Sequence, residues 1–222
     1  MEKSHIPAQS LLQFADGFAI IKVEFIIHER RIEMAQMQLK MTRFAGPVKE
    51  KALPDGYFFR LFDGSEREID EWVRLCNFGL MEGSTRDTFF ETVGNFENVV
   101  ATRDCFFVID PEGKYIASST AVATPDGVGL VHMVASDPAA RGKGIGHAML
   151  AHTLSMLEER GMRRVDLRTD DWRLAAVKTY LDAGFLPVLL DDPESDHAAR
   201  WDKVRADLSY PAVTYVTEGA LA

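Results

Sequence analysis

The sequence predicts an α/β fold in which a mixed central β-sheet is flanked by helices on both faces. Two observations lead to this fold class. Short strand-like segments come first and are joined by tight turns, such as the Pro-Glu-Gly-Lys turn at 111–114. From Gly129 onward strands and helices alternate, which adds parallel strands to the sheet. With 222 residues the chain can fill one core, so we expect a main domain at 53–222 preceded by an extension at 1–52.

The extension is predicted to be an N-terminal β-hairpin. Apolar and polar residues alternate at 18–27 and again at 35–44, and the charged segment 28–33 separates the two. A helix is the alternative for either segment, because Met, Gln and Lys also favour helices. A two-stranded hairpin is marginal alone and needs a packing partner, either the main domain or a second copy of the chain. A homodimer formed through this arm is therefore one hypothesis.

The main domain shows a strand-like or helix-like pattern in nearly every segment. Ser65 with Glu68 three residues later resembles a capping box, which predicts where the first helix begins. Gly161 and Gly184 follow two helical patterns and predict where those helices end. The predicted strands are 57–62, 104–110, 115–122, 129–135, 164–169, 185–190 and 212–217, and the predicted helices are 65–76, 85–93, 148–160, 171–183 and a segment around Trp201.

Composition narrows the class of protein. Apolar residues make up 46% of the chain, charged residues 27%, and the net charge is −9, so we expect neither nucleic-acid nor membrane binding. No apolar run approaches the ~20 residues that span a bilayer, and no signal peptide is recognised. Cys76 and Cys105 lack metal-ligand spacing. We therefore expect a cytoplasmic protein with reduced thiols and no metal site, and we predict that His152 and His197 lie at the surface.

The segment Arg141–His147 carries the strongest chemical signal. It lies between a predicted strand and a predicted helix, where unpaired backbone N–H groups and the helix dipole favour an anion. Its three alternating glycines let a phosphate approach the backbone, and Arg141 and Lys143 add positive charge. One alternative is a simple tight turn. Another is a dinucleotide-binding loop of an oxidoreductase, Gly-x-Gly-x-x-Gly, in which His147 occupies the place of the third glycine.

Two blocks together resemble one family. Arg141, Gly144 and Gly146 fill the fixed positions of Arg/Gln-x-x-Gly-x-Gly/Ala, motif A of the GNAT N-acetyltransferase superfamily. The later segment 171–185 resembles the closing helix of that superfamily, Asn-x-x-Ala-x-x-x-Tyr-x-x-x-Gly-Phe. Its tyrosine position is Tyr180, whereas Arg173 replaces the usual asparagine. The resemblance extends over roughly residues 55–217.

The resemblance implies the GNAT fold and acetyl-CoA as co-substrate. The cofactor would lie between the strand that ends at Ala135 and the strand that ends at Thr169, where the two separate. The loop 77–83 and its flanking helices would form the wall over the acceptor. The implied cofactor contacts are Met133, Val134, Ala135, Arg141, Gly142, Lys143, Gly144, Ile145, Gly146, His147 and Arg173.

The implied catalytic residues are Tyr180 and His132. Tyr180 matches the acid that protonates the departing thiolate, although packing under the helix is the alternative for such a tyrosine. His132, nine residues before Arg141, matches a histidine of the arylalkylamine type and could accept the ammonium proton. It could equally be a structural histidine within the sheet. The loop carboxylates Asp170, Asp171 and Glu82 are alternative bases.

These features predict an N-acetyltransferase that acts by direct attack in a ternary complex. The acceptor would be the primary amine of a small molecule or peptide. The alternative is a non-catalytic acyl-CoA sensor. It is favoured by the loss of two family residues, the asparagine at Arg173 and a glutamate whose place is taken by Arg168.

Overall fold

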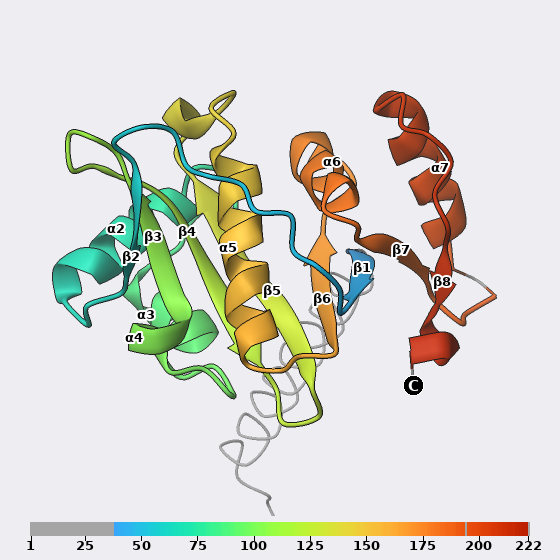
Figure 1. Cartoon of the computed structure of the whole chain (residues 1–222), viewed down its shortest axis with the longest axis horizontal. Coiled ribbons are helices and arrows are strands. Elements are labelled where there is room, and N and C mark those ends of the chain that lie inside the picture. The colour runs from blue at the N-terminus through green and yellow to red at the C-terminus, as the bar shows by residue number, and fades with distance from the viewer. Residues whose placement is uncertain (1–37, 194, 222) are drawn as a thin grey trace, which may run out of the picture. The chain divides into compact units, whose positions relative to one another are not determined.

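The protein is described here by a computed structural model of residues 38–193 and 195–221. The strand predicted at 18–27 and the turn after it lie outside these residues. The described chain forms an eight-stranded sheet in the order β2-β3-β4-β5-β6-β1-β7-β8 (Figure 1). In chain order the strands are β1 Leu39–Phe44, β2 Phe58–Leu61, β3 Cys105–Ile109, β4 Tyr115–Ala123, β5 Val128–Ser136, β6 Arg164–Thr169, β7 Leu186–Leu189 and β8 Val216–Thr217.

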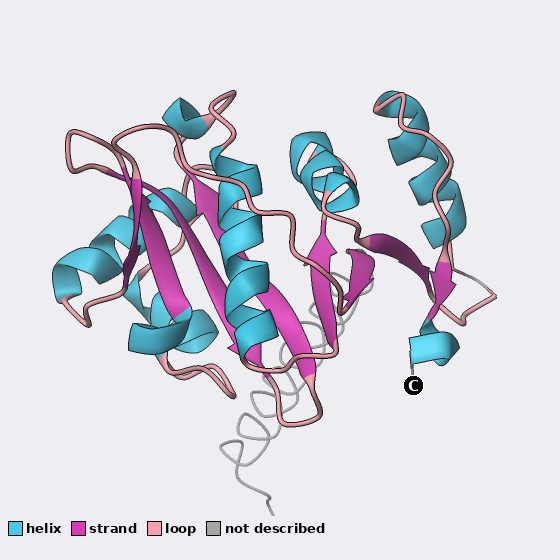
Figure 2. Cartoon of the chain, viewed as in Figure 1, coloured by secondary structure: helices cyan, strands magenta, loops and turns pink. Residues whose placement is uncertain are grey.

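Helices cover both faces of this sheet (Figure 2). The three-stranded meander β3-β4-β5 is antiparallel, and β5 and β6 are parallel. The sheet is therefore mixed, and the predicted fold class is confirmed. The helices are α2 Glu66–Cys76, α3 Arg86–Phe89 with a π-helical turn Phe90–Gly94, α4 Ala101–Asp104, α5 Ile145–Glu159, α6 Leu174–Asp182 and α7 His197–Asp207, with 3-10 turns at Pro138–Ala140 and Glu218–Leu221.

Strand β3 shows how the core is divided between the two faces. All five of its residues are buried. Phe107 belongs to a cluster with Trp72 and Phe89 from α2 and α3, whereas Phe106 belongs to a cluster with Met149 from α5. Because side chains alternate across a strand, a strand apolar at every position needs cover on both faces. This alternation fixes α5 on one face and the α2–α3 pair on the other.

Strand β1 is an internal member of the sheet. It runs antiparallel to β6 along its whole length and antiparallel to β7 over Lys40–Thr42. Leu39 and Met41 are fully buried, as their alternation with polar residues predicts. Both edges of the strand are thus occupied, and residues 39–44 share the sheet of the main domain although the prediction grouped them with the extension. Alternation identifies a strand, but it carries no information about the strand's partner.

Two element boundaries differ from the prediction for local reasons. Helix α5 begins at Ile145, three residues earlier than predicted, because Gly144 adopts a left-handed conformation (φ 76°) and serves as the N-cap. The last strand is shorter than the predicted 212–217, and only Val216 and Thr217 pair with β7.

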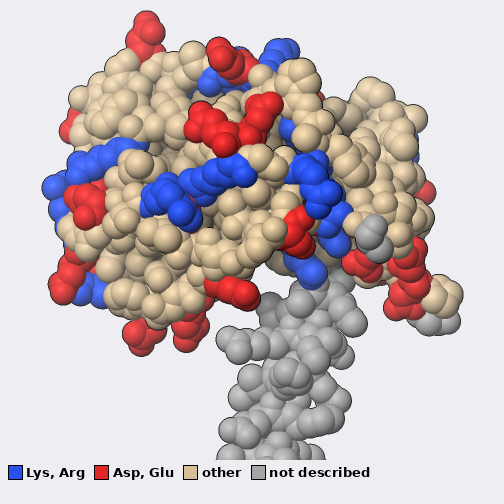
Figure 3. All heavy atoms as spheres, turned by 60° about the horizontal axis from the view of Figure 1, so that its bottom comes forward, with Lys and Arg blue, Asp and Glu red and all other residues tan. Residues whose placement is uncertain are grey.

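The surface drawn in Figure 3 carries charges of both signs. Lysines and arginines alternate with aspartates and glutamates across this face, so it shows no continuous basic patch. Within the described ranges, no helix is both long enough and apolar enough to cross a bilayer.

Asp104 ties α4 to the end of α5 through a buried carboxylate. Its side chain is fully buried and lies 2.7 Å from Arg103 Nε and 2.8 Å from the Arg160 guanidinium. It also accepts the backbone N–H of Val100 at 2.7 Å. Burial raises the pKa of this carboxyl, but the bonds from Arg103 and Val100 and the charge of Arg160 outweigh burial, so the pKa lies below its ordinary value.

We expect Asp104→Asn to lower the free energy of unfolding by about 2 kcal/mol. Breaking a buried ion pair costs ~3–5 kcal/mol, and the partial exposure of both arginines reduces that figure. Because the folded pKa is lowered, this stabilisation is present above the unfolded pKa near ~3.9 and is lost as pH falls through the folded pKa. Urea denaturation from pH 7 to pH 3 measures both effects. The exposed Asp202→Asn is the control, and an equal loss in both variants would contradict the prediction.

Candidate functional site

Strands β5 and β6 pair only at their beginnings. Parallel pairing joins Val128, Gly129 and Leu130 to residues 164–166, and neither the rest of β5 nor the rest of β6 continues it. The two strands diverge toward their carboxyl ends (Figure 1). Past Leu130 the two strands therefore form no backbone pairs with each other, and backbone groups without a strand partner can bond a ligand with amide groups. The structure thus has the strand separation predicted before Ala135 and Thr169.

An irregularity in β5 lies at this separation. The register between β4 and β5 shifts between Ser118 and Thr120, and Met133 on β5 has a left-handed backbone (φ 50°). A bulge of this kind bends the strand and changes the direction of the backbone N–H and C=O groups next to it. Ala135 and Met133 pack toward the α2–α3 cluster, and Val134 packs toward α5. The backbone of these three predicted cofactor contacts thus follows an irregular path where the strands diverge.

The glycine loop between β5 and α5 is open on its outer side. Gly142 (φ 73°) and Gly144 (φ 76°) are left-handed, a conformation that an L side chain would strain. A Cβ built on Gly142 or Gly146 would meet no atom within 4 Å. Ile145 alone in the loop turns inward and is 1% exposed. The predicted anion site therefore presents the backbone at the start of α5, with the glycine positions clear.

Lys143 and His147 of this loop have defined partners. Lys143 Nζ lies 3.1 Å from the hydroxyl of Tyr57, and Arg141 is exposed. His147 Nε2 lies 3.5 Å from Asp182, a residue at the end of α6 that also pairs with Lys178. The first turn of α5 is thus held against the end of α6. The cations lie beside the open glycines, as an anion site requires.

Tyr180 lies on α6 in the core cluster that includes Val131 of β5 and Leu167 of β6. Its ring contacts Phe185 edge-on, with the ring centroids 6.0 Å apart. The residue is 8% exposed, and its hydroxyl has no hydrogen-bond partner among residues 38–193 and 195–221. Burial raises the pKa of Tyr180 to about 12, and the charge on Arg173 opposes this rise in part. The phenol is therefore a neutral donor with its proton available.

His132 lies on β5, next to the irregularity. Its Nε2 is 2.8 Å from the backbone oxygen of Thr92, and its ring stacks on Phe96 with centroids 4.5 Å apart. A carbonyl only accepts, so Nε2 carries the proton and Nδ1 has the free lone pair. Burial lowers the pKa of His132 below its ordinary value, opposed in part by the bond to Thr92. The imidazole is thus neutral at pH 7, in the form that can accept a proton.

Arg173, predicted as a cofactor contact, reaches another part of the chain. Its Nε lies 2.6 Å from Asp170, and its two terminal nitrogens donate to the backbone oxygens of Gly79 and Leu80 at 2.8 and 3.0 Å. The guanidinium carbon lies 4.2 Å from the centroid of the Trp172 ring. This side chain joins the β6–α6 turn to the loop between α2 and α3.

The loop carboxylates suggested as alternative bases fall into two groups. Asp170 is paired with Arg173, and Asp171 lies 3.0 Å from Arg200, so each has a cationic partner. Each of these carboxylates already bonds a guanidinium, so that oxygen is not free to take a proton from an amine. Glu82 is exposed in the loop between α2 and α3. Of these candidates and His132, only His132 combines partial burial on β5 with a free lone pair.

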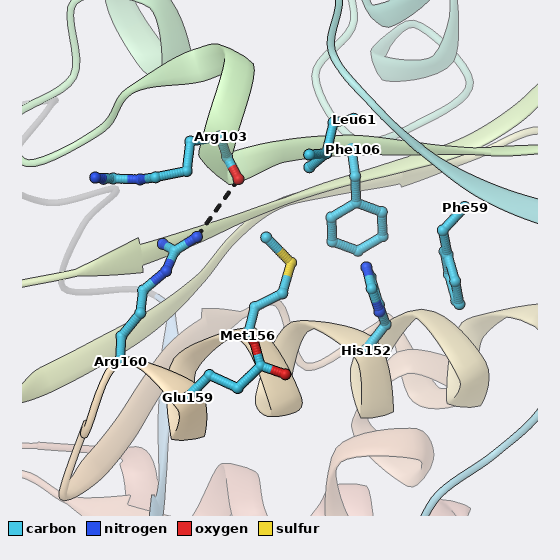
Figure 4. A pocket seen from close by; sticks show the side chains of 8 residues that line it. All are labelled: Phe59, Leu61, Arg103, Phe106, His152, Met156, Glu159 and Arg160. Carbon is cyan, nitrogen blue, oxygen red and sulfur yellow. Dashed lines mark hydrogen bonds between the residues drawn. The ribbon is translucent and has the colours of Figure 1, made fainter.

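A cavity of about 370 Å³ lies elsewhere, between the edge strand β2, β3 and α5 (Figure 4). His152 lies inside this cavity, stacked on Phe59 with centroids 4.1 Å apart and edge-on to Phe106. His152 is partly exposed, whereas the prediction of a surface position was wrong for His197, which is 2% exposed. Arg160 donates to the Arg103 backbone oxygen at 3.4 Å at one end (Figure 4). The cavity holds none of the predicted site residues.

Sequence reasoning missed the residues that hold the predicted ones in place. Thr92 and Phe96 fix His132, and the backbone oxygens of Gly79 and Leu80 fix Arg173. A backbone oxygen has no signature in a sequence, and these contacts join residues far apart in the chain. Only the fold reveals them.

Comparisons with known proteins give a consistent result. Residues 67–185, a little over half of the chain, match the model of the Acetyltransferase (GNAT) family. A mycothiol acetyltransferase of Nocardia farcinica is 30% identical over 170 residues, which are 69% of this chain and 53% of that protein. One from Thermomonospora curvata is 23% identical over 168 residues, 70% of this chain and 52% of that protein. The chain spans about half the length of the curated relatives it matches.

Solved structures agree on the fold. A GCN5-related N-acetyltransferase from Sphaerobacter thermophilus superposes with a TM-score of 0.55 at 21% identity, over 68% of this chain and 48% of that one. The N-acetyltransferase region of a fungal multi-domain β-N-acetylglucosaminidase superposes with a TM-score of 0.52 at 17% identity. The match covers 68% of this chain and 19% of that one.

Proposed function

The chain belongs to the GNAT family of acetyltransferases, and on that premise we propose that it transfers an acetyl group from acetyl-CoA to a primary amine. The observation that carries the proposal is the strand separation beside an open glycine loop, with Tyr180 and His132 on elements that border it. The diphosphate of the coenzyme would bind the backbone N–H groups at the start of α5. Its pantetheine would extend the backbone bonding of β5 between the two strands.

The residues suit direct attack by the amine. In the proposed reaction His132 Nδ1 takes a proton from the ammonium group, and the freed amine attacks the thioester carbonyl. A backbone N–H near Val134 would face the oxygen as it becomes anionic. As the carbon–sulfur bond breaks, Tyr180 donates its proton to the departing sulfur, and the tyrosinate regains a proton from the nitrogen of the new amide. The same burial that raises the pKa of the phenol also raises that of a thiol beside it, so the two groups remain matched.

The cysteines support transfer without a covalent enzyme intermediate. Cys76 and Cys105 are both buried, and burial raises the pKa of each thiol to about 12. A buried neutral thiol is a poor nucleophile. We therefore propose a ternary complex, and we expect initial-rate lines that intersect when both substrates are varied. Parallel lines would indicate an acyl-enzyme and overturn this part of the proposal.

The acceptor is proposed to be a small-molecule amine. The names of the relatives, mycothiol acetyltransferase, support the amine precursor of mycothiol as our first candidate, and peptide amines are the second. The test is thiol release from acetyl-CoA with a panel of such amines, together with mass detection of the acetylated product. Acetyl-CoA binding without turnover of any amine would favour the non-catalytic sensor instead.

The proposed base predicts a pH dependence. A rate that needs neutral His132 falls as pH drops through its pKa, and burial places that pKa below ~6.5. We expect kcat to have an acid limb with a midpoint below that value. We expect His132→Gln, whose amide can still donate to Thr92, to lower kcat roughly tenfold at pH 7 and to remove the limb. An unchanged limb in the variant would assign it to another group.

A further inference from the structure

Arg173 bridges two loops that border the strand separation. It precedes α6, the helix that carries Tyr180, and its guanidinium bonds to backbone oxygens 93 and 94 residues earlier in the chain. Three of its five N–H groups are used by Asp170, Gly79 and Leu80. The guanidinium carbon lies over the Trp172 ring, and the Arg173 side chain is 21% exposed. Few of its donors remain for a cofactor.

The loop that Arg173 contacts is organised from its base. Asn77 Nδ2 donates to the backbone oxygens of Val73 and Ser84 at 2.9 and 3.0 Å, and its Oδ1 accepts the backbone N–H of Gly83 at 2.8 Å. These bonds draw together the two ends of the 77–84 loop. Arg173 bonds to the middle of the same loop, at residues that Asn77 does not hold. The loop is thus fixed at both its base and its centre.

Exposed apolar side chains surround this contact. Phe78 and Met81 of the loop are 44% and 39% exposed, and Trp172 is 66% exposed. Such side chains are unfavourable in water unless they meet a ligand or partner. Because Arg173 stacks on Trp172 and bonds the residues between Phe78 and Met81, it holds these three apolar groups at one place on the surface.

We propose that Arg173 is a positioning residue that holds the 77–84 loop and so shapes the acceptor side of the site. This inference rests on the proposed function and on the predicted position of the 77–83 loop over the acceptor. A planar, bidentate donor can bond two successive backbone oxygens, which a lysine ammonium cannot reproduce. Acceptor affinity, and not acetyl-CoA affinity, should therefore depend on the guanidinium.

The test compares Arg173→Lys, which keeps the charge, with Arg173→Ala. For Arg173→Lys we expect the acceptor KM to rise roughly tenfold, with acetyl-CoA KM within about twofold of wild type. Arg173→Ala should raise the acceptor KM further and also lower kcat, because it removes the positive charge near Tyr180. Arg205→Ala, which removes an arginine paired with Asp202 on α7, is the matched control and should change neither KM.

Two results would overturn the inference. A rise in acetyl-CoA KM alone would make Arg173 a cofactor ligand, and unchanged constants in both variants would leave it no role in the site. Hydrogen exchange supplies a readout that needs no turnover. We expect the amides of 78–83 to exchange at least tenfold faster in Arg173→Ala than in wild type or Arg205→Ala, with acetyl-CoA binding unchanged. If the wild-type protein acetylates no amine, the proposed function is wrong. If the amides of 78–83 exchange equally fast in all three proteins, Arg173 does not hold the loop and the inference is wrong.

Discussion

Replacing Tyr180 with phenylalanine is expected to lower kcat by about 100-fold or more, with acetyl-CoA KM within about twofold of wild type. Loss of a positioned proton donor typically costs ~10²–10⁴ in rate. The hydroxyl bonds no described residue, so its removal leaves no buried partner unsatisfied. The free energy of unfolding should therefore change by less than about 1 kcal/mol. Steady-state kinetics and urea denaturation of the same samples separate the two effects.

Tyr215→Phe is the matched control for this experiment. Its hydroxyl bonds Asp202 at 3.0 Å on α7, outside the proposed site, so its loss should leave kcat unchanged. A Tyr180→Phe enzyme with kcat within about threefold of wild type would remove the phenol from the mechanism. Because burial raises the pKa of Tyr180 to about 12, the phenol stays protonated throughout the neutral range. Any alkaline limb of kcat below pH ~10 should therefore persist in the variant.

Gly146→Asp is expected to abolish acetyl-CoA binding while leaving the fold intact. A Cβ at this position meets no protein atom within 4 Å, and the residue lies in the first turn of α5. An acidic side chain there interacts favourably with the helix dipole by ~0.3–1 kcal/mol, so stability should hold or rise. The same carboxylate would repel the proposed diphosphate at a cost of several kcal/mol, and we expect the Kd to rise by about 100-fold or more.

Gly146→Ala isolates the charge from the added carbon. Alanine relieves the cost of a helical glycine, about 0.5–1 kcal/mol, and adds no charge. We expect it to melt at or above the wild-type temperature and to bind acetyl-CoA within a few-fold of wild type. Calorimetric titration gives the affinities, and thermal unfolding gives the stabilities. Wild-type affinity in Gly146→Asp would exclude this helix start as the anion site.

Local sequence patterns were sufficient to predict most of the helices and strands. Ser65 marks the start of α2, where its side chain accepts the N–H of Glu68 as predicted, although the Glu68 carboxylate accepts the N–H of Asp63 in place of that of Ser65. The alternating glycines predicted an open turn at the head of α5, and the left-handed Gly142 and Gly144 form it. Both features depend on residues within a few positions of one another. Short-range steric and hydrogen-bonding preferences determine them.

Contacts between residues far apart in the chain could not be predicted from local sequence patterns. The same alternation would suit β1 in a hairpin or between β6 and β7, and only sheet assembly selects the second. Arg173 fits a phosphate contact by charge, and in the fold two of its donors bond the backbone oxygens of Gly79 and Leu80. His132 could be base or structural residue until Thr92 fixes which nitrogen carries the proton.

The sequence by itself therefore determined the mixed sheet, its helices and the glycine loop at the head of α5, because each follows from chain neighbours. Tertiary structure alone decided the partners of β1, the state of His132 and the loop that Arg173 holds. These depend on atoms brought together from distant parts of the chain, and a side chain's partners are set by where the backbone places it.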